Sequence, residues 1–286
     1  MDKLGLPFKN LSLYNASMRK GLEDKLFFLE HLPEDNYTFV DFGCADGSVI
    51  GALCTIYPDK RGLNTYIGYD ISSDMISLAK TNFDGDVDEE VVFTSDWKEV
   101  IGELSKSKNK KVLILSSVIH EIYSYGEIPK DIDTFWDRVL NTGFDYICIR
   151  DMMPSRDIVR ETPVAIHSAI HYDPNHVLNE GQLAEFEHIH GTTWSMKQAV
   201  HFLLKYRWKV NWKREVNENY FPIFVEDLIG ALSLKKYFHD ADTYKLDYLE
   251  RFQVPYLMEH IKKDFGIEFE DFTHVKAIFT KNYVYT

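Results

Sequence analysis

The sequence predicts an α/β protein built on a doubly wound, mostly parallel sheet of seven strands, with a helical cap inserted after the fifth strand. Three observations lead to this fold class. Strand-like and helix-like segments alternate over residues 37–151, which is typical of a parallel sheet with helices on both faces. The apolar run KVLILSS (Lys111–Ser117) has the unbroken hydrophobicity of a strand that is buried on both faces. After Asp151 the alternation stops and helical patterns follow.

Five strands are predicted in the first half of the chain. An amphipathic helix over Ser17–Leu32, which Pro33 ends, precedes them. Each strand is a short run rich in β-branched and aromatic residues, and cap or turn residues separate it from a helical pattern. Helices are expected after the cap residues 72–74 and over Ile132–Leu140. The strands are expected from Tyr37 onward, at Thr65–Asp70, at Val91–Thr94, at Lys111–Ser117 and at Asp145–Ile149.

The second half of the chain is less regular. Residues 152–224 are rich in histidine, tryptophan and proline and predict an inserted helical cap, with its clearest helix at Ser195–Trp208. A helix at Val225–Tyr237 and strands at Tyr244–Phe252 and His274–Lys281 resume the core, and a second small helical insert (Gln253–Gly266) lies between these strands. The expected parts are an N-terminal helical segment (1–36), a Rossmann-like core (37–151), the cap (152–224) and the C-terminal part of the core (225–286).

Composition limits the class of protein. The 286 residues are 45% hydrophobic and include 19 Phe, 17 Tyr and 5 Trp, which predicts a globular protein with a sizeable core. A net charge of −13 disfavours non-specific binding to polyanions. The three cysteines lack zinc-site spacing and favour a reducing compartment. Because the chain shows neither an export signal nor a membrane-length apolar run, we expect a soluble, cytoplasmic protein.

The stretch VDFGCADGS, residues 40–48, is expected to form a tight turn between a strand and a helix. Glycines there let a ligand approach the main chain, and the free N–H groups at the helix start point into the turn. Neither phosphate-binding pattern is present, since the glycines lack the dinucleotide spacing and no lysine follows Gly47. Asp41 would repel a phosphate but attract an ammonium group. The alternative is an ordinary turn with a capping Asp.

The spacing D-x-G-x-A-x-G, formed by Asp41, Gly43, Ala45 and Gly47, resembles motif I of the class I S-adenosylmethionine (SAM) methyltransferases. Ala45 replaces the middle glycine of that motif. In the family this loop holds the amino-acid end of SAM. The closing order of helix, strand and strand is also similar to the family, in which the last strand runs antiparallel between the fifth and sixth. The resemblance covers residues 37–151 and, more loosely, 225–286.

Two further strand ends complete the SAM site that the resemblance implies. In the family an acid at the position of Asp70 accepts hydrogen bonds from both ribose hydroxyls, and Ile71 would pack on the adenine face. An acid after the third strand, here Asp96, accepts from the adenine N6 amine, while the next N–H, that of Trp97, donates to N1. The local alternatives are a helix cap for Asp70 and a turn with a packed aromatic for Asp96 and Trp97. Acids at successive strand ends suit the sulfonium and ammonium charges of SAM.

The acceptor is expected beside the end of the fourth strand. In the family this segment, here residues 116–125, borders the methionine end of SAM and the acceptor, and Ser117 is assigned to SAM. His120 is the predicted base, because imidazole titrates near neutrality, and Glu121 is its expected orienter. The alternative is a structural His120. Asp151, in an R-D pair that resembles some tRNA-modifying members of the family, is a further catalytic candidate. Two tyrosines are expected to line the acceptor pocket, Tyr123 and Tyr125.

Two other clusters have a functional and a structural interpretation. Five cap histidines invite a metal site, but His167 and His171 lack the Glu of the H-E-x-x-H motif, so we expect a solvated or core set and no metal. The basic and aromatic stretch 205–214 would bind RNA if its charges met phosphates and its tryptophans stacked on bases. Alternation of period two instead predicts aromatics that face the core and charges that face water, which is the favoured interpretation. The five histidines are His167, His171, His176, His188 and His190.

The sequence therefore predicts a SAM-dependent methyltransferase, a transferase with SAM as its cofactor, acting on a small-molecule acceptor. The negative charge and the aromatic cap favour the small molecule. Two alternatives stay open: an RNA (tRNA) base methyltransferase, and a methyltransferase-like protein that binds without catalysis. No membrane partner is expected, and neither the acceptor atom nor the oligomeric state can be read from the sequence.

Overall fold

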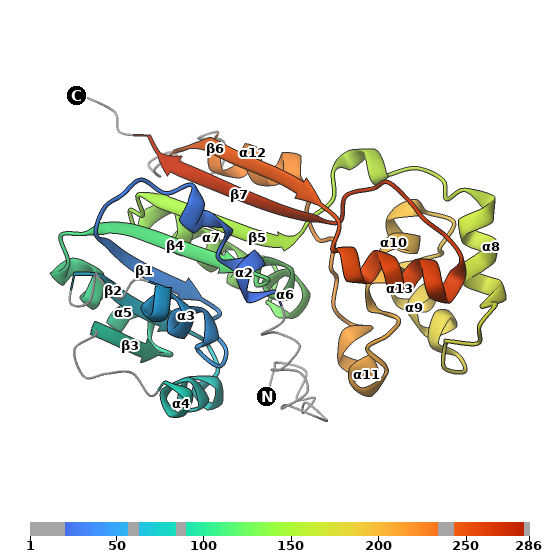
Figure 1. Ribbon diagram of the computed structural model, residues 1–286, viewed down its shortest axis with the longest axis horizontal. Coiled ribbons are helices and arrows are strands. Elements are labelled where there is room, and N and C mark those ends of the chain that lie inside the picture. The colour runs from blue at the N-terminus through green and yellow to red at the C-terminus, as the bar shows by residue number, and fades with distance from the viewer. Residues whose placement is uncertain (1–20, 57–62, 84–89, 234–242, 283–286) are drawn as a thin grey trace.

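The computed structural model describes residues 21–56, 63–83, 90–233 and 243–282. Seven strands form one sheet in the order β3-β2-β1-β4-β5-β7-β6 (Figure 1). The first five pair in parallel, and β7 lies antiparallel between β5 and β6. This confirms the predicted fold class and the strand arrangement that the resemblance implies. The strands are β1 (Tyr37–Phe42), β2 (Thr65–Tyr69), β3 (Glu90–Thr94), β4 (Lys110–Ser116), β5 (Tyr146–Met152), β6 (Tyr244–Phe252) and β7 (His274–Lys281).

Helices cover both faces of the sheet, so most residues of its central strands are buried. All residues of β1 and β2 are buried, as expected for a parallel sheet with two covered faces. One apolar cluster joins the sheet to α5, α7 and α12, and a second joins the other face to η1, α3 and α4. These helices are η1 (Phe27–Glu30), α3 (Ser48–Ile56), α4 (Ser73–Asn82), α5 (Trp97–Lys106), α7 (Lys130–Asn141) and α12 (Val225–Ser233), and two short ones are α2 (Leu22–Lys25) and α6 (Ile119–Tyr125).

A third apolar cluster forms the core of a helical region beside the sheet, at the right of Figure 1. Helix α13 (Pro255–Phe265), which follows β6, contributes Ile261 and Phe265 to this cluster. The insert predicted between the last two strands therefore packs with the cap, far along the chain from the cap's other helices. None of the helices in the described ranges is both long and apolar enough to cross a membrane. The other helices of the region are η3 (Arg156–Ile158), α8 (Val164–Tyr172), α9 (Gln182–His190), α10 (Met196–Lys205), η4 (Lys209–Asn211) and α11 (Trp212–Glu215).

Two predicted elements differ from the structure. The helix expected over Ser17–Leu32 breaks at Leu26, between α2 and η1, and residues 1–20 lie outside the described ranges. The chain leaves α-helical geometry at Leu26, whose φ of −96° and ψ of 13° lie outside the α region, and it continues as a short 3-10 turn. Strand β5 continues to Met152, because β7 pairs with it as far as His274, so Asp151 lies inside a strand. The end of the helix predicted to reach Tyr237 lies outside the described residues.

Candidate active site

The loop after β1 has the left-handed backbone that small residues accommodate. Gly43, Ala45 and Gly47 have φ of 80°, 46° and 77°, and the N–H groups of Gly43 and Cys44 both donate to the carbonyl of Tyr69, at 2.7 and 3.0 Å. A Cβ on Gly43 would lie 2.8 Å from Cγ2 of Val118, which precedes α6. The tight turn therefore ties the end of β1 to the ends of β2 and β4. The carboxylate of Asp46 also accepts from the N–H of Ser48, the first residue of α3, at 3.2 Å.

Ala45, the departure from the glycine motif, carries a strained backbone. For a residue with a Cβ, a φ of 46° costs about 1 kcal/mol or more, whereas glycine adopts it freely. We expect Ala45→Gly to raise the free energy of unfolding by about 0.5–1 kcal/mol in a urea titration. The matched control, Ala52→Gly inside α3, should lower it by about 1 kcal/mol, because glycine is unfavourable in a helix interior. Equal effects of the two substitutions would contradict this account.

Asp41 is a buried carboxylate near the end of β1. It is 3% exposed, and burial raises its pKa from 3.8 to about 7, even though the nearby charge of Lys25 acts to lower it. Lys25, at the end of α2, is itself buried, and its burial lowers its pKa. The loop thus holds an acid whose charge is poorly compensated within the protein.

Asp70 stands directly after β2 and faces the loop. Its carboxylate accepts from the N–H of Ala45 at 3.0 Å and from the N–H of Ser72 at 2.8 Å. Burial raises its pKa, while these two hydrogen bonds act in the opposite direction. The helix cap itself is Ser72, whose hydroxyl accepts from the N–H of Met75. The next side chain, Ile71, is 82% exposed. Asp70 therefore supports the loop, and beside it an apolar side chain lies uncovered.

Asp96 and Trp97 have local partners. The Asp96 carboxylate caps α5 by accepting from the N–H of Lys98 at 2.9 Å. The Trp97 ring packs against Phe42 and Tyr69, with centroid distances of 5.5 and 5.1 Å. The side chains of Asp96 and Trp97 therefore have the structural roles of the alternative interpretation, a turn with a packed aromatic ring. Trp97 is the first residue of α5, so its N–H has no acceptor within the helix. This N–H is therefore available for the predicted contact with N1 of an adenine.

His120 and Asp151 form a buried pair at the ends of β4 and β5. Nδ1 of His120 lies 2.6 Å from Oδ1 of Asp151, whose other oxygen accepts from the N–H groups of Val118 and Ile119 at 3.1 and 2.7 Å. Burial acts to lower the pKa of His120, but the charge and hydrogen bond of Asp151 outweigh it and, with nearby glutamates, raise the pKa to about 9. Asp151 thus holds both the ring and the start of α6, and His120 is protonated at neutral pH.

Glu121 does not orient His120, so that prediction is wrong. Consecutive residues of a helix point about 100° apart, and Glu121 reaches Arg214, whose Nη2 lies 3.3 Å from its Oε1. Arg214 Nη1 lies 2.8 Å from Glu218 Oε1 and 3.8 Å from Glu215 Oε1. Burial and the charges of Glu215 and Glu121 raise the pKa of Glu218 to about 8. Nothing in the sequence points to Glu215 and Glu218, because no local pattern relates α11 and the segment after it to α6.

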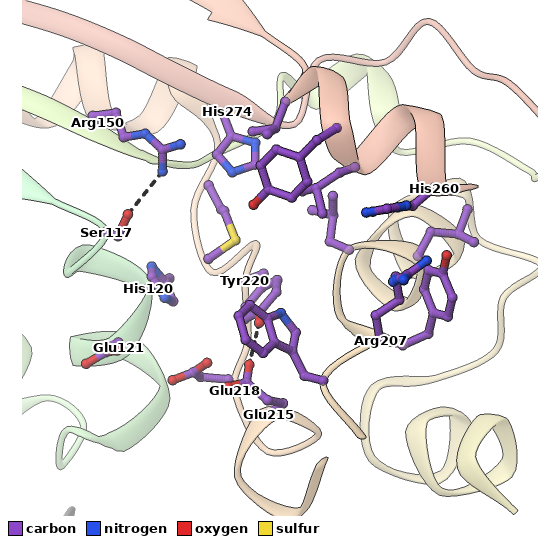
Figure 2. A pocket seen from close by; sticks show the side chains of 18 of the residues that line it. Ser117, His120, Glu121, Arg150, Arg207, Glu215, Glu218, Tyr220, His260 and His274 are labelled. Atoms are coloured by element: carbon purple, nitrogen blue, oxygen red, sulfur yellow. Dashed lines mark hydrogen bonds between the residues drawn. The ribbon is translucent and has the colours of Figure 1, made fainter. Parts of the chain in front are cut away.

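A cavity of about 310 Å³ lies between these residues and the helical region. His120, Glu121 and Ser117 are on one side, Glu215 and Glu218 are in the centre, and Arg207 and His260 are at the far side (Figure 2). Ser117, with φ of 57°, accepts through its Oγ from Arg150 Nη1 at 3.1 Å, and Arg150 also pairs with Asp24. The glycine loop is not among the lining residues; Lys25 and Ser117 stand at the border between them.

Tyr123 and Tyr125 do not line this cavity, contrary to their predicted role in acceptor binding. Helix α6 turns them toward other elements. The hydroxyl of Tyr123 accepts from Trp136 Nε1 at 2.9 Å, and the ring of Tyr125 stacks under the guanidinium of Arg214. The five cap histidines do not line it either: His167 stacks on Trp194, and His190 Nε2 bonds the carbonyl of Val216. The lining histidines are His120, His260 and His274.

The stretch 205–214 is not an alternating segment. It forms the end of α10, a 3-10 turn and the start of α11, so the prediction that its charges all face water is wrong. Lys205 is fully buried, and its Nζ donates to the carbonyls of Glu215 and Glu218. Burial lowers the pKa of Lys205 to about 7. Arg214 is also buried. These two cations neutralise carbonyl dipoles and carboxylates inside the protein and are not presented to a polyanion.

No protein-family model and no curated protein sequence matches the chain. Among solved structures, the plantazolicin methyltransferase BamL, in complex with a triazolic desmethylPZN analog and SAH, is 12% identical, with a TM-score of 0.43 over 96% of this chain and 88% of that one. SAM-dependent methyltransferases from Anabaena variabilis (12%, TM-score 0.48, 96% and 92%) and Methanosarcina mazei (12%, TM-score 0.47, 89% and 96%) are similar in the same degree. At such identities nothing about the substrate or chemistry of this chain follows from them.

Proposed function

We propose that this chain is a SAM-dependent methyltransferase that acts on a small-molecule acceptor. One observation carries the proposal: the carboxylate of Asp70 and the left-handed loop at Ala45 are joined by a hydrogen bond at the tips of β1 and β2. Ligands of doubly wound sheets bind at the carboxyl ends of the strands, near the point where the strand order reverses, which here lies between β1 and β4.

The residues around this point fit the charges and shape of SAM. Asp41 would face the ammonium group, and the backbone of Gly43, Ala45 and Gly47 would let the amino-acid end approach. Asp70 would accept from the ribose hydroxyls with the lone pairs that its two N–H contacts leave over. Four more residues complete the assignment, with Ile71 on the adenine face, Trp97 (main chain) and Asp96 at the adenine edge, and Ser117 near the methionine end.

The exposed side chain of Ile71 and the N–H of Trp97 support a bound adenine. An isoleucine that is 82% exposed directly after a buried strand leaves apolar area in water, and a base that covers it would recover about 25 cal/mol for each Å². Among the described residues no main-chain carbonyl outside α5 accepts from the Trp97 N–H, which lies at the start of α5 in the same layer of strand ends. The N–H and the apolar side chain together suit the edge and the face of a purine.

The acceptor would occupy the cavity beside His120. A volume of about 310 Å³ is in the range of small-molecule sites. SAM supplies a methyl group on a sulfonium, and the protein's main task is to hold the acceptor in line with it. His120 and Glu121 would contact the acceptor, and Asp151 acts as a positioning residue behind His120. If His120 accepts the acceptor's proton, as the sequence suggests, it must first lose its own, because its pKa is about 9.

The RNA alternative has less support. Within the stretch that suggested it, Lys205 and Arg214 are buried, and Arg207 pairs with Asp264 at 2.8 Å. A small molecule therefore stays the first choice. Binding of tRNA that persists at moderate salt and weakens steeply as salt rises would favour the RNA alternative.

The proposal is tested by Asp70→Asn. The substitution keeps the size of the side chain and one carbonyl oxygen for the loop, but it removes the charge that strengthens hydrogen bonds to the ribose. We expect SAM affinity, measured by calorimetry, to fall about 100-fold, since charge-assisted hydrogen bonds contribute about 1.5–3 kcal/mol.

Asp74→Asn is the matched control, because Asp74 lies one turn further along on the exposed side of α4. Its SAM affinity should equal that of the wild type. Unchanged affinity in Asp70→Asn would refute the ribose assignment. SAM binding without any turnover in fractionated cell extract would instead favour the alternative of a binding protein without catalysis.

A further inference from the structure

Three metal-ligating side chains from distant parts of the chain meet in the cavity wall. Among the described residues, His120, Glu121 and Glu218 form the one group whose ligand atoms all lie within 4.8 Å of one another. Figure 2 shows His120 and Glu121 on one helix and Glu218 opposite them. We propose that this group, called the HEE cluster below, binds one divalent cation of the first transition row. Local spacings in the sequence predict no metal site, because these ligands lie far apart along the chain, on α6 and after α11.

The ring of His120 is already held as metal-ligating histidines usually are. Its Nδ1 lies 2.6 Å from the buried carboxylate of Asp151, so the other nitrogen, Nε2, is the ligand atom, and the ion would take the place of the proton that this nitrogen otherwise carries. A carboxylate behind the imidazole fixes the tautomer, orients the ring and increases the basicity of the ligand nitrogen. Asp151 is fully buried and is held in turn by main-chain N–H groups, so this support is rigid.

Glu218 supplies the observation that points to an absent ligand. Its side chain is nearly fully buried, and within the described part of the chain its Oε1 accepts no hydrogen bond. Arg214 Nη1 lies 2.8 Å from this oxygen, but not in hydrogen-bond geometry. A buried carboxylate oxygen without a hydrogen bond is costly, and a coordinated cation removes that cost.

The charges around the HEE cluster leave room for a cation. Glu121, Glu215 and Glu218 are three carboxylates grouped around the guanidinium of Arg214, and the buried ammonium of Lys205 interacts with two of them, Glu215 and Glu218. Asp151 adds a fourth acid on the far side of the His120 ring. Arg214 is the rival occupant, because its guanidinium balances part of this charge from one side. A metal ion on the cavity side would share the carboxylates with it.

The ligand types narrow the choice of ion. One imidazole nitrogen with two carboxylates is a ligand set that suits Mn²⁺ and Zn²⁺. It suits Mg²⁺ and Ca²⁺ less well, because these two ions prefer oxygen ligands alone. Three protein ligands leave at least one coordination position open, as in catalytic sites, and this position would face the cavity because all three residues line it. With an ion bound, His120 and Glu121 would reach the acceptor through the ion.

The test uses the full chain, freed of metal by a chelator and desalted, without any cofactor. Mn²⁺ is titrated in, the free ion is followed by its electron paramagnetic resonance signal, and Zn²⁺ is then added as a competitor. We expect one Mn²⁺ bound per chain and displaced by Zn²⁺. Glu218→Gln and Glu121→Gln should each weaken binding at least about tenfold, the range for losing a supporting group of a metal site.

Glu187→Gln is the matched control, since Glu187 also pairs with a histidine, His171, but lies in the cap away from the cavity. It should bind Mn²⁺ as the wild type does. Circular dichroism checks that each variant folds. If Glu218→Gln does not fold, Glu121→Gln alone tests the proposal. Absence of Mn²⁺ and Zn²⁺ binding in the wild type would overturn the proposal, and so would wild-type affinity in both cluster variants. The carboxylates would then be balanced by the protein's own cations, Arg214 and Lys205. Because no SAM is present, neither result bears on the proposed methyltransferase activity.

Discussion

Asp151→Asn is expected to lower the free energy of unfolding by about 3–5 kcal/mol, the cost of breaking a buried charged pair by changing one partner. Asp151 is fully buried and its two oxygens accept from His120, from Met152 at 2.7 Å, and from the N–H groups at the start of α6. In asparagine an NH₂ group replaces one of the two carboxylate oxygens. This group is itself a donor, so the donors that this oxygen accepted from would lose their partner. Urea unfolding followed by tryptophan fluorescence measures the change.

Asp145→Asn is the control for a carboxylate that is less buried. Asp145 lies just before β5, accepts from the N–H of Lys111 at 2.7 Å and lies 3.5 Å from Nζ of Lys110. Its loss should cost about 1 kcal/mol, the usual contribution of a hydrogen bond that water partly replaces. Similar losses for the two variants would show that Asp151 does not hold α6 and His120 together as described.

Asp41→Asn is expected to stabilise the cofactor-free protein at pH 8 by up to roughly 4 kcal/mol. Each tenfold change in an acid constant is about 1.4 kcal/mol, and burial raises the pKa of Asp41 from 3.8 to about 7. Between these two values the folded chain holds a proton that the unfolded chain has lost. Wild-type stability should therefore fall as pH rises from about 4 to 7 and stay low above pH 7.

The variant should lose this part of the pH dependence, which thermal unfolding at pH 5 and pH 8 would reveal. The exposed control Asp74→Asn should change stability by less than about 0.5 kcal/mol at either pH. If Asp41→Asn destabilised the protein at pH 8, the electrostatic attraction between Asp41 and Lys25 would outweigh the cost of burying the Asp41 charge. Under the proposed function the same variant should bind SAM more weakly, because the charge assigned to the ammonium group is gone. A stabler protein with weaker cofactor binding would mark Asp41 as a residue kept for function.

Much of the SAM-side arrangement could be predicted because its residues follow strands directly. Hydrophobic runs such as Lys111–Ser117 predict buried parallel strands, and parallel strands end at one edge of the sheet. The acids Asp41 and Asp70 and the loop at Ala45 therefore converge without any long-range information. The structure shows the convergence through the hydrogen bond between Ala45 and Asp70, while their contacts with SAM stay a prediction.

The cavity side depended on tertiary structure. His120 finds Asp151 on the neighbouring strand and not the adjacent Glu121, because helix geometry separates consecutive side chains. Lys205 and Arg214 look like surface charges in the sequence but are buried, since carbonyls and carboxylates of α11 and of the segment after it surround them.

By itself, then, the sequence determined the order of strands and helices and the strand-end acids, since both depend on periodicity and on immediate neighbours. Only the tertiary structure decided which charges share the cavity. Such pairings join segments such as α6 and Glu218 that are distant along the chain, and their free energy comes from desolvation in a space that exists only once the sheet and the helical region have packed together.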